Sequence, residues 1–302
     1  KDFVPSDVEI KKKNKGSVGN LIETYGFGIE NNGIAEPDFI TESVELKILP
    51  LEKSGNTLKI KERTKICSIN YKTLPLETWS ESHARSKLKK ILFIFTIHHN
   101  DPWETIVKDY TLYSIDKDES ILKKDWLSTY EMVKSGNAHN LSESIANYLS
   151  PSRSGSGGKK EDGTPRDLVD QYKNAQPKAL RRAFSLKTSY TNTIFQENIG
   201  RKKFSSLSET EFKGNEYDVI PFVLSKINSY RGQTIHEFAN HNRLTLNKGK
   251  ANNAQLIRAS LGLRGNHNNV REFRRLGLKI KVVPVNNITL MPYESMSFPR
   301  VK

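Results

Sequence analysis

Apolar and polar positions change their spacing several times along the first half of the chain. Apolar side chains first recur at helical spacing, which predicts a short amphipathic helix that ends at Gly26. Residues 44–49 then alternate apolar and polar side chains, as a strand with one buried face does. The same pattern predicts strands at 60–70, 91–97 and 105–114, and helices at 81–90, 119–134 and 141–149. Helices and strands mixed in this order predict an α/β domain built on a sheet.

The middle of the chain is more polar. Residues 150–166 combine Gly, Ser and Pro with Lys and Arg, which predicts a flexible basic loop. Residues 178–195 form a second block of basic and aromatic side chains. The polar stretch 201–216 predicts a linker that follows a first domain at residues 1–200.

The remaining residues, 217–302, contain echoes of the beginning of the chain. Residues 272–285 match residues 38–51 in the positions of Phe, Lys and Pro, and five further positions are apolar in both. An internal repeat of this kind predicts a partial second copy of the first domain. Because the copy stops at Lys302 and the chain starts at Lys1 rather than Met, we expect trimming at the start and continuation past the end.

Charge is the first property that narrows the function. The 302 residues carry 48 Lys and Arg against 34 Asp and Glu, a formal net charge of +14. Such an excess attracts polyanions, most often nucleic acids, although ribosomal and membrane-surface proteins share it. The sequence has no run of about 18 apolar residues that would predict a membrane span. The single cysteine, Cys67, cannot form an internal disulfide, which fits a reducing, cytoplasmic location.

Candidate chemistry lies on the first predicted strand. Glu45 and Lys47 are two positions apart, so their side chains share one face while their neighbours point to the core. Asp38 lies seven positions before Glu45 and follows a proline, close enough for the two carboxylates to meet. Together with the carbonyl of Leu46, they offer the all-oxygen ligands that Mg²⁺ prefers. Lys47 could orient an attacking water or offset charge on a phosphate, and Glu23 is a further acid for the metal shell.

The Glu-x-Lys pattern by itself is weak. It also occurs at Glu9 and Lys11, and again at Glu211 and Lys213, where we interpret it as solvated charge. The pattern on the first strand differs because an upstream Asp accompanies an apolar strand that forces both charges onto one face. From the residues alone, a metal-dependent phosphodiesterase and an ordinary edge-strand ion pair both stay open.

Several further motifs accompany this cluster. In chain order they are Lys15 to Glu23, Val44 to Pro50, Thr78 to Lys89, Asp125 with Trp126, and Phe184 to Lys187. Together with Asp38 they resemble the MutH family of GATC endonucleases, which includes the mismatch-repair nicking enzyme and Sau-type restriction enzymes. The resemblance covers about residues 15–195. It departs at Ser185, where the nicking enzyme has Tyr, so the resemblance implies no role for an aromatic hydroxyl at this position.

The resemblance implies a fold and an active site. The fold is a PD-(D/E)xK restriction-endonuclease-like α/β fold, a mixed sheet flanked by helices, followed by a partial, degenerate MutH-like copy. The implied active-site residues are Glu23, Asp38, Glu45 and Lys47, with Lys15 and Lys87 as supporting basic residues. Mg²⁺ is the implied cofactor, with Asp38, Glu45 and Leu46 as its ligands. The implied partner is double-stranded DNA that contains GATC, and we expect a dimer on this DNA because one set of ligands cuts one strand at a time.

The second copy favours a restriction enzyme, because Sau-type enzymes carry two MutH-like copies in one chain. The residues that correspond to Glu23, Asp38, Glu45 and Lys47 are Arg258, Glu272, Lys279 and Lys281. One carboxylate beside two lysines cannot hold Mg²⁺ well, so this copy should bind DNA without cutting it. In the family such a copy is thought to bind a second GATC site as an effector. A mismatch-repair-type nicking endonuclease and a non-catalytic DNA-binding regulator are the two alternatives.

Six basic residues are candidate DNA contacts. They are Lys15, Arg85, Lys89, Arg153, Arg182 and Lys187. We predict that Arg153, Arg182 and Lys187 read bases, because an Arg fork can bind both acceptors of guanine in the major groove. Arg153 is favoured because the family's base-reading Arg lies shortly after a Tyr-Leu pair, echoed here by Tyr148 and Leu149.

Overall fold

The chain forms two units, Lys1–Lys203 and Phe204–Lys302, which we describe separately. The computed structural model describes residues 17–29, 36–97, 99, 101, 104–173, 176–200, 203–245, 251–263, 269–283, 285–286, 288–293 and 295. The predicted DNA contact Lys15 lies outside these residues. Within the described ranges, no helix has both the length and the apolar character needed to cross a membrane.

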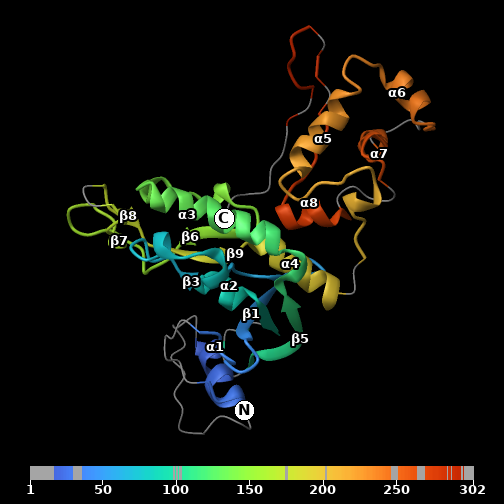
Figure 1. Cartoon of the computed structure of the whole chain (residues 1–302). Coiled ribbons are helices and arrows are strands. Elements are labelled where there is room, and N and C mark those ends of the chain that lie inside the picture. Colours follow the sequence, from blue (N-terminus) through green and yellow to red (C-terminus); the bar gives the residue numbers. More distant parts are fainter. Residues whose placement is uncertain are drawn as a thin grey trace. The chain divides into compact units, whose positions relative to one another are not determined.

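A four-stranded mixed sheet carries the first predicted strand (Figure 1). Its order is β2 (Thr57–Ile60), β1 (Glu45–Ser54), β4 (Lys90–Ile97) and β5 (Ile106–Ser114). β1 runs parallel to β4, and the other two pairings are antiparallel. Leu46 is fully buried and Lys47 next to it is partly exposed, but Glu45 is buried as well, so burial along β1 does not alternate strictly as its sequence predicts.

A three-stranded antiparallel sheet completes the first unit. Its order is β3 (Thr64–Ser68), β9 (Arg182–Leu186) and β6 (Leu149–Arg153), and a short ladder joins β7 (Leu168–Val169) to β8 (Ala179–Leu180). The helices are α1 (Ser17–Leu21), a π-helical turn (Ile22–Gly26), α2 (His83–Leu88), α3 (Glu119–Lys134) and α4 (Thr188–Asn198). Short 3₁₀ turns lie at Leu74–Leu76, Trp79–Glu81, Ile115–Lys117, Ala138–Asn140 and Glu143–Ile145. This mixed α/β arrangement is the coarse fold that the sequence predicts.

Helix α4 packs on the mixed sheet through side chains at helical spacing. The rings of Phe195 and Phe95 lie 4.8 Å apart, and the Gln196 amide donates to the carbonyl of Leu58 at 3.0 Å. The side chain of Asn192 accepts from the backbone N–H of Ile60 at 2.8 Å. These bonds fasten the end of β2, so the hairpin that it forms with β1 has a fixed position.

The single strand predicted at 60–70 is two strands in the structure. Thr57–Ile60 pairs with β1 across a turn in which Gly55 has a φ of +60°, a conformation that favours glycine. Thr64–Ser68 instead pairs with β9 in the other sheet. The intervening residues 61–63 leave one sheet and enter the next, which period-two spacing alone does not reveal.

The helix predicted at 141–149 is wrong. The fully buried carboxylate of Asp125 accepts the backbone N–H groups of Asn147, Tyr148 and Leu149 at 2.7, 2.6 and 2.9 Å. These amides are therefore not available for helical hydrogen bonds, and Leu149 begins strand β6. The predicted flexible loop at 150–166 accordingly starts as a strand, and only residues after Arg153 form a loop.

The second unit is helical in its described part. Its helices are α5 (Val219–Asn228), α6 (Ile235–His241), α7 (Ala251–Ser260) and α8 (Arg271–Leu276), with a 3₁₀ turn at Leu207–Glu209. Its core contains Leu207, Phe212, Val219, Ile257, Leu261, Val270 and Phe273. The stretch 201–216, predicted as a linker, therefore contributes to this core from Leu207 onward. Isolated apolar residues in a polar segment, here Leu207 and Phe212, carry this role.

A tight turn follows Asp38 and leads into β1. Ser43 has a left-handed φ of +54°. Its N–H donates to the carbonyl of Ile40 at 3.2 Å, and the N–H of Val44 donates to the carbonyl of Phe39 at 3.1 Å. The turn therefore folds the chain back so that Asp38 comes beside the strand that it precedes.

The corresponding turn after Glu272 has the same bonds. Gly277 has a φ of +68°, its N–H donates to the carbonyl of Arg274 at 3.1 Å, and the N–H of Leu278 donates to the carbonyl of Phe273 at 2.7 Å. The remainder differs from the predicted repeat. Glu272 lies in α8, and residues 278–283, all of which the structure describes, contain no strand.

Candidate active site

The centre of the candidate site is the carboxylate of Glu45, the first residue of β1. This residue is 1% exposed. Lys87 on α2 donates to both of its carboxylate oxygens, at 3.1 and 2.9 Å. Lys47 donates to the Oε1 atom of Glu45 and, at 3.1 Å, to the carbonyl of Leu46. A buried carboxylate needs such partners, and here two ammonium groups supply them.

Two further acids belong to the same cluster. The Oδ2 atom of Asp38 accepts the N–H of Leu46 at 2.8 Å. Burial raises the pKa of Glu23 above its ordinary value; Lys47 opposes this effect, and the negative charge of Asp38 adds to it. Glu45 also raises and Lys87 also lowers this pKa, so the structure brings together all five residues predicted as catalytic.

The oxygen atoms of this cluster fit a hard divalent cation. Among the described residues, no group of three or more His, Cys, Asp or Glu side chains could hold a metal. The predicted set is different, because it combines two carboxylates with the backbone carbonyl of Leu46. The Lys47 ammonium binds both Glu45 and that carbonyl, so a cation already lies between two of the three predicted ligands. Oxygen ligands of this kind suit Mg²⁺.

The cysteine near this cluster is not a nucleophile. Burial raises the pKa of Cys67 to about 12; the negative charge of Glu77 adds to the effect and Lys87 opposes it. At neutral pH the side chain is therefore a protonated thiol, and only the thiolate attacks.

The predicted DNA contacts on and near α2 remain on the surface. The side chain of Ser82 caps the helix by accepting the N–H of Arg85 at 3.2 Å. The Nε of Arg85 donates to Glu119 at 2.7 Å, and Lys89 is exposed just after the helix. Arg85 lies on the helix that carries Lys87 and Lys89 directly follows it, which places basic charge beside the cluster.

Two other predicted DNA contacts point inward. The Arg182 guanidinium donates to the carbonyls of Pro151, at 2.7 Å, and Leu141; burial lowers its pKa. The ammonium of Lys187 donates to the carbonyl of Ala146, and burial lowers its pKa as well. The structure therefore presents neither charged group to a DNA base.

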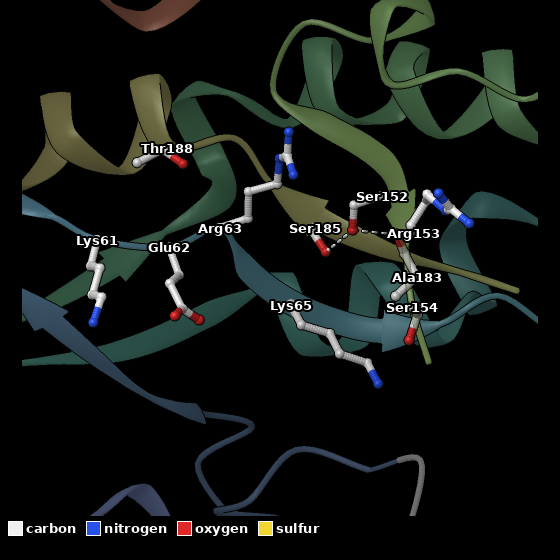
Figure 2. A pocket seen from close by; sticks show the side chains of 10 residues that line it. All are labelled: Lys61, Glu62, Arg63, Lys65, Ser152, Arg153, Ser154, Ala183, Ser185 and Thr188. Carbon is white, nitrogen blue, oxygen red and sulfur yellow. Dashed lines mark hydrogen bonds between the residues drawn. The ribbon is translucent and has the colours of Figure 1, made fainter. Parts of the chain in front are cut away.

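Arg153 lines an open hollow of about 410 Å³ on the three-stranded sheet (Figure 2). The other residues around it are Lys61, Glu62, Arg63, Lys65, Ser152, Ser154, Ala183, Ser185 and Thr188. With Arg153 included, four of the lining side chains are cationic and one is anionic. Ser152 and Ser185 hydrogen-bond to each other at 2.7 Å. A hollow with this charge balance suits a polyanion.

Comparison with known proteins gives the family. Residues 27–125 match the family model described as DNA mismatch repair enzyme MutH. The DNA mismatch repair protein MutH of Vibrio vulnificus (strain YJ016) is 32% identical over 200 residues, which are 64% of this chain and 81% of that protein. The chain belongs to the MutH family.

A second relative matches almost the whole chain. The type II restriction enzyme Sau3AI of Staphylococcus aureus is 30% identical over 307 residues, which cover 96% of this chain. The chain spans 60% of the length of that enzyme. The MutH protein of Vibrio cholerae serotype O1 (strain M66-2) is 31% identical over 64% of the chain. The match to the restriction enzyme thus extends over residues that the MutH proteins do not cover.

The MutH family model covers only part of the site. Its range includes Asp38, Glu45, Lys47 and Lys87, but neither Glu23 nor Arg153. The sequence predictions missed three basic residues of the hollow, Lys61, Arg63 and Lys65. These three residues are spaced two positions apart, which in an extended segment places their side chains on one face. The sequence alone contained this signal.

Proposed function

We propose that this MutH-family chain is a type II restriction endonuclease that hydrolyses DNA phosphodiester bonds at GATC sites. One observation carries the proposal: a buried Glu45 is held by two lysines, with Asp38 beside the next residue of the strand. An ordinary exposed ion pair would not bury a carboxylate or recruit a second lysine from another element. The formal net charge of +14 supports DNA as the substrate.

The chemistry assigns a role to each group. Asp38, Glu45 and the carbonyl of Leu46 would hold Mg²⁺. When bound, this ion would polarise the scissile phosphate and lower the pKa of the attacking water. Lys47 orients the attacking water and offsets the charge that develops on the phosphate. Lys87 holds both oxygens of Glu45, which fixes the direction in which that carboxylate points. Glu23, whose pKa burial raises above its ordinary value, is a further acid beside the metal ligands.

Incubation of the chain with supercoiled plasmid and Mg²⁺ tests this function. A restriction enzyme converts a plasmid with GATC sites to linear fragments, whereas a plasmid without GATC stays intact. Nicked circles alone would favour the mismatch-repair-type nicking endonuclease. DNA that is shifted in a gel but uncut would favour a non-catalytic regulator. EDTA should abolish cleavage if a divalent cation is required.

Arg153→Ala is expected to weaken binding to GATC DNA by about 1–3 kcal/mol and binding to random DNA only slightly. Arg153 is exposed at the hollow, while the two other predicted base readers are held inside. Fluorescence anisotropy with a GATC duplex and a shuffled duplex measures both values. Equal losses on the two duplexes would make Arg153 a phosphate contact instead of a base reader.

We also propose that residues 217–302 belong to a catalytically degenerate MutH-like copy that binds a second GATC site as an effector. The turn with the same two hydrogen bonds after Asp38 and after Glu272 supports it. Glu272 accepts bonds from the hydroxyl of Ser206, at 2.5 Å, and from the N–H of Leu207, at 3.0 Å, so its carboxylate is engaged within the unit. Lys279 is exposed where Glu45 would correspond, which suits phosphate rather than metal.

The full-length enzyme should then cut a plasmid with two GATC sites faster than a plasmid with one site, and short GATC duplexes added in trans should raise the rate on the one-site plasmid. The 302-residue chain by itself should lack this stimulation, so the variants below are made in the full-length enzyme. Lys279→Ala is expected to remove this stimulation without changing the unstimulated rate. Lys226→Ala is the control, because Lys226 pairs with Glu211 in the same unit. Equal rates on both plasmids, with no response to added duplex, would contradict an effector role. Whether two chains assemble on one site is tested by sedimentation with GATC duplex, where we expect a dimer.

A further inference from the structure

Strand β6 is short, but several interior groups fix its position. Asp125 on α3 accepts the three consecutive N–H groups of residues 147–149, at the start of the strand. This carboxylate is fully buried, so it cannot touch DNA. A charged acceptor with three backbone donors is a strong anchor, since charge-assisted bonds are about twice as strong as neutral ones.

Arg182 holds the middle of the same strand. Arg182 lies on β9 directly opposite Arg153 of β6. The two side chains nevertheless differ in their exposure to solvent. Arg153 is exposed, while Arg182 is 9% exposed and donates to the carbonyls of Pro151 and Leu141. A planar guanidinium can bridge two separate acceptors, which a single ammonium group does less well. Arg182 thereby ties β6 to the segment before it.

The end of β6 is fastened from both sides of Arg153. The hydroxyl of Ser152 bonds to that of Ser185 at 2.7 Å. Beyond the strand, the carboxylate of Asp167 accepts the N–H of Gly157 at 2.6 Å. A side chain at Gly155 would meet the same carboxylate, since a Cβ there would lie 2.4 Å from its Oδ1. The backbone that carries Arg153 is therefore fixed before and after it.

We propose that Arg182 and Asp125 are positioning residues for DNA specificity: from the interior they fix β6 so that Arg153 meets the DNA in one orientation. This inference rests on the proposed recognition of GATC by Arg153. Fixing the strand in advance removes the entropy of ordering it on binding and holds the Arg fork in the geometry that a base requires. It also gives Arg182, predicted from sequence to contact DNA, a role that it performs through another residue.

The test measures the ratio of dissociation constants for a shuffled duplex and a GATC duplex, by anisotropy without a divalent cation. Arg182→Gln and Asp125→Asn should each lower this ratio about fivefold or more. Neither should lower it further when Arg153 is already Ala, because both act through that side chain. Arg181→Gln is the matched control, since Arg181 is the adjacent arginine and is exposed. It should leave the ratio unchanged.

Thermal unfolding monitors whether each variant is folded. If Arg182→Gln does not fold, Arg182→Lys keeps the charge but not the fork, and Asp125→Asn tests the same strand independently. An unchanged ratio in folded Arg182 and Asp125 variants would overturn the proposal. Losses that add to that of Arg153→Ala would also overturn it, because they would mean separate contacts with DNA. A wild-type chain that prefers GATC but never cuts it would refute the nuclease function and leave this inference standing.

Discussion

Glu45→Ala is expected to reduce the rate of metal-dependent DNA cleavage by a factor of hundreds or more while DNA binding stays nearly intact. The side chain is the most buried acid of the site and the acceptor for both lysines. Its loss removes a proposed metal ligand and leaves Lys47 and Lys87 without their shared partner. Asp38→Ala should have a similar effect on the rate. Single-turnover cleavage of a GATC duplex measures the chemical step, and anisotropy measures binding.

Binding to DNA should even tighten slightly in Glu45→Ala, because a negative charge leaves a site that faces phosphate. Glu52→Ala is the matched control, since Glu52 lies on the same strand but is exposed. It should cut at the wild-type rate. Glu45→Gln keeps the size of the side chain and removes its charge, so it separates ligand loss from a packing defect. A Glu45→Ala protein that cuts at nearly the wild-type rate would show that the site is elsewhere.

Lys47→Met should lower the same rate by about a hundredfold or more, which is typical when a group that stabilises developing charge is removed. Met has nearly the same length and cannot donate a hydrogen bond. The fold should survive, because Lys87 still pairs with both oxygens of Glu45. Single-turnover rates at saturating enzyme isolate this effect from changes in affinity.

Lys53→Met provides the comparison, as Lys53 is exposed on the same strand. If the cleavage rate falls only slightly in Lys47→Met as well as in Lys53→Met, then Lys47 does no more than neutralise the charge of Glu45. Metal affinity offers a second readout, since Lys47 binds two of the proposed ligand atoms. Titration with Mn²⁺ should show tighter metal binding in Lys47→Met, because a competing cation is gone.

The cluster around Glu45 was predictable because its residues are close in sequence. Asp38, Glu45 and Lys47 lie within ten positions, and strand periodicity alone places the last two on one face. Lys87 was found only through family resemblance, since nothing local links a helix at His83–Leu88 to β1. The long apolar patterns also predicted secondary structure well. Helix α3 has the predicted bounds, and β4 and β5 each begin one residue away from the predicted position.

The hollow could not be predicted in the same way. Its residues come from three distant segments that meet only because β3, β9 and β6 pair. The pairing of β3 with β9 joins strands more than a hundred positions apart, and such a pairing leaves no local signal. Arg182 shows the same difficulty, because every residue of β9 is buried and no alternation marks which side is outward. The positive charge of Arg182 predicted a contact with DNA, but in the structure its guanidinium donates to two interior carbonyl groups instead.

The turn before β1 has an energetic consequence. Ser43 adopts a left-handed φ of +54°, which costs an L-residue roughly 1–2 kcal/mol, whereas Gly277 adopts the same conformation almost freely. The first unit thus gives up folding free energy to keep Asp38 beside β1. The second unit, whose Glu272 serves only its own packing, carries no such strain at this turn. At this turn, therefore, the unit that brings carboxylates together carries backbone strain, and the unit that does not do so uses glycine instead.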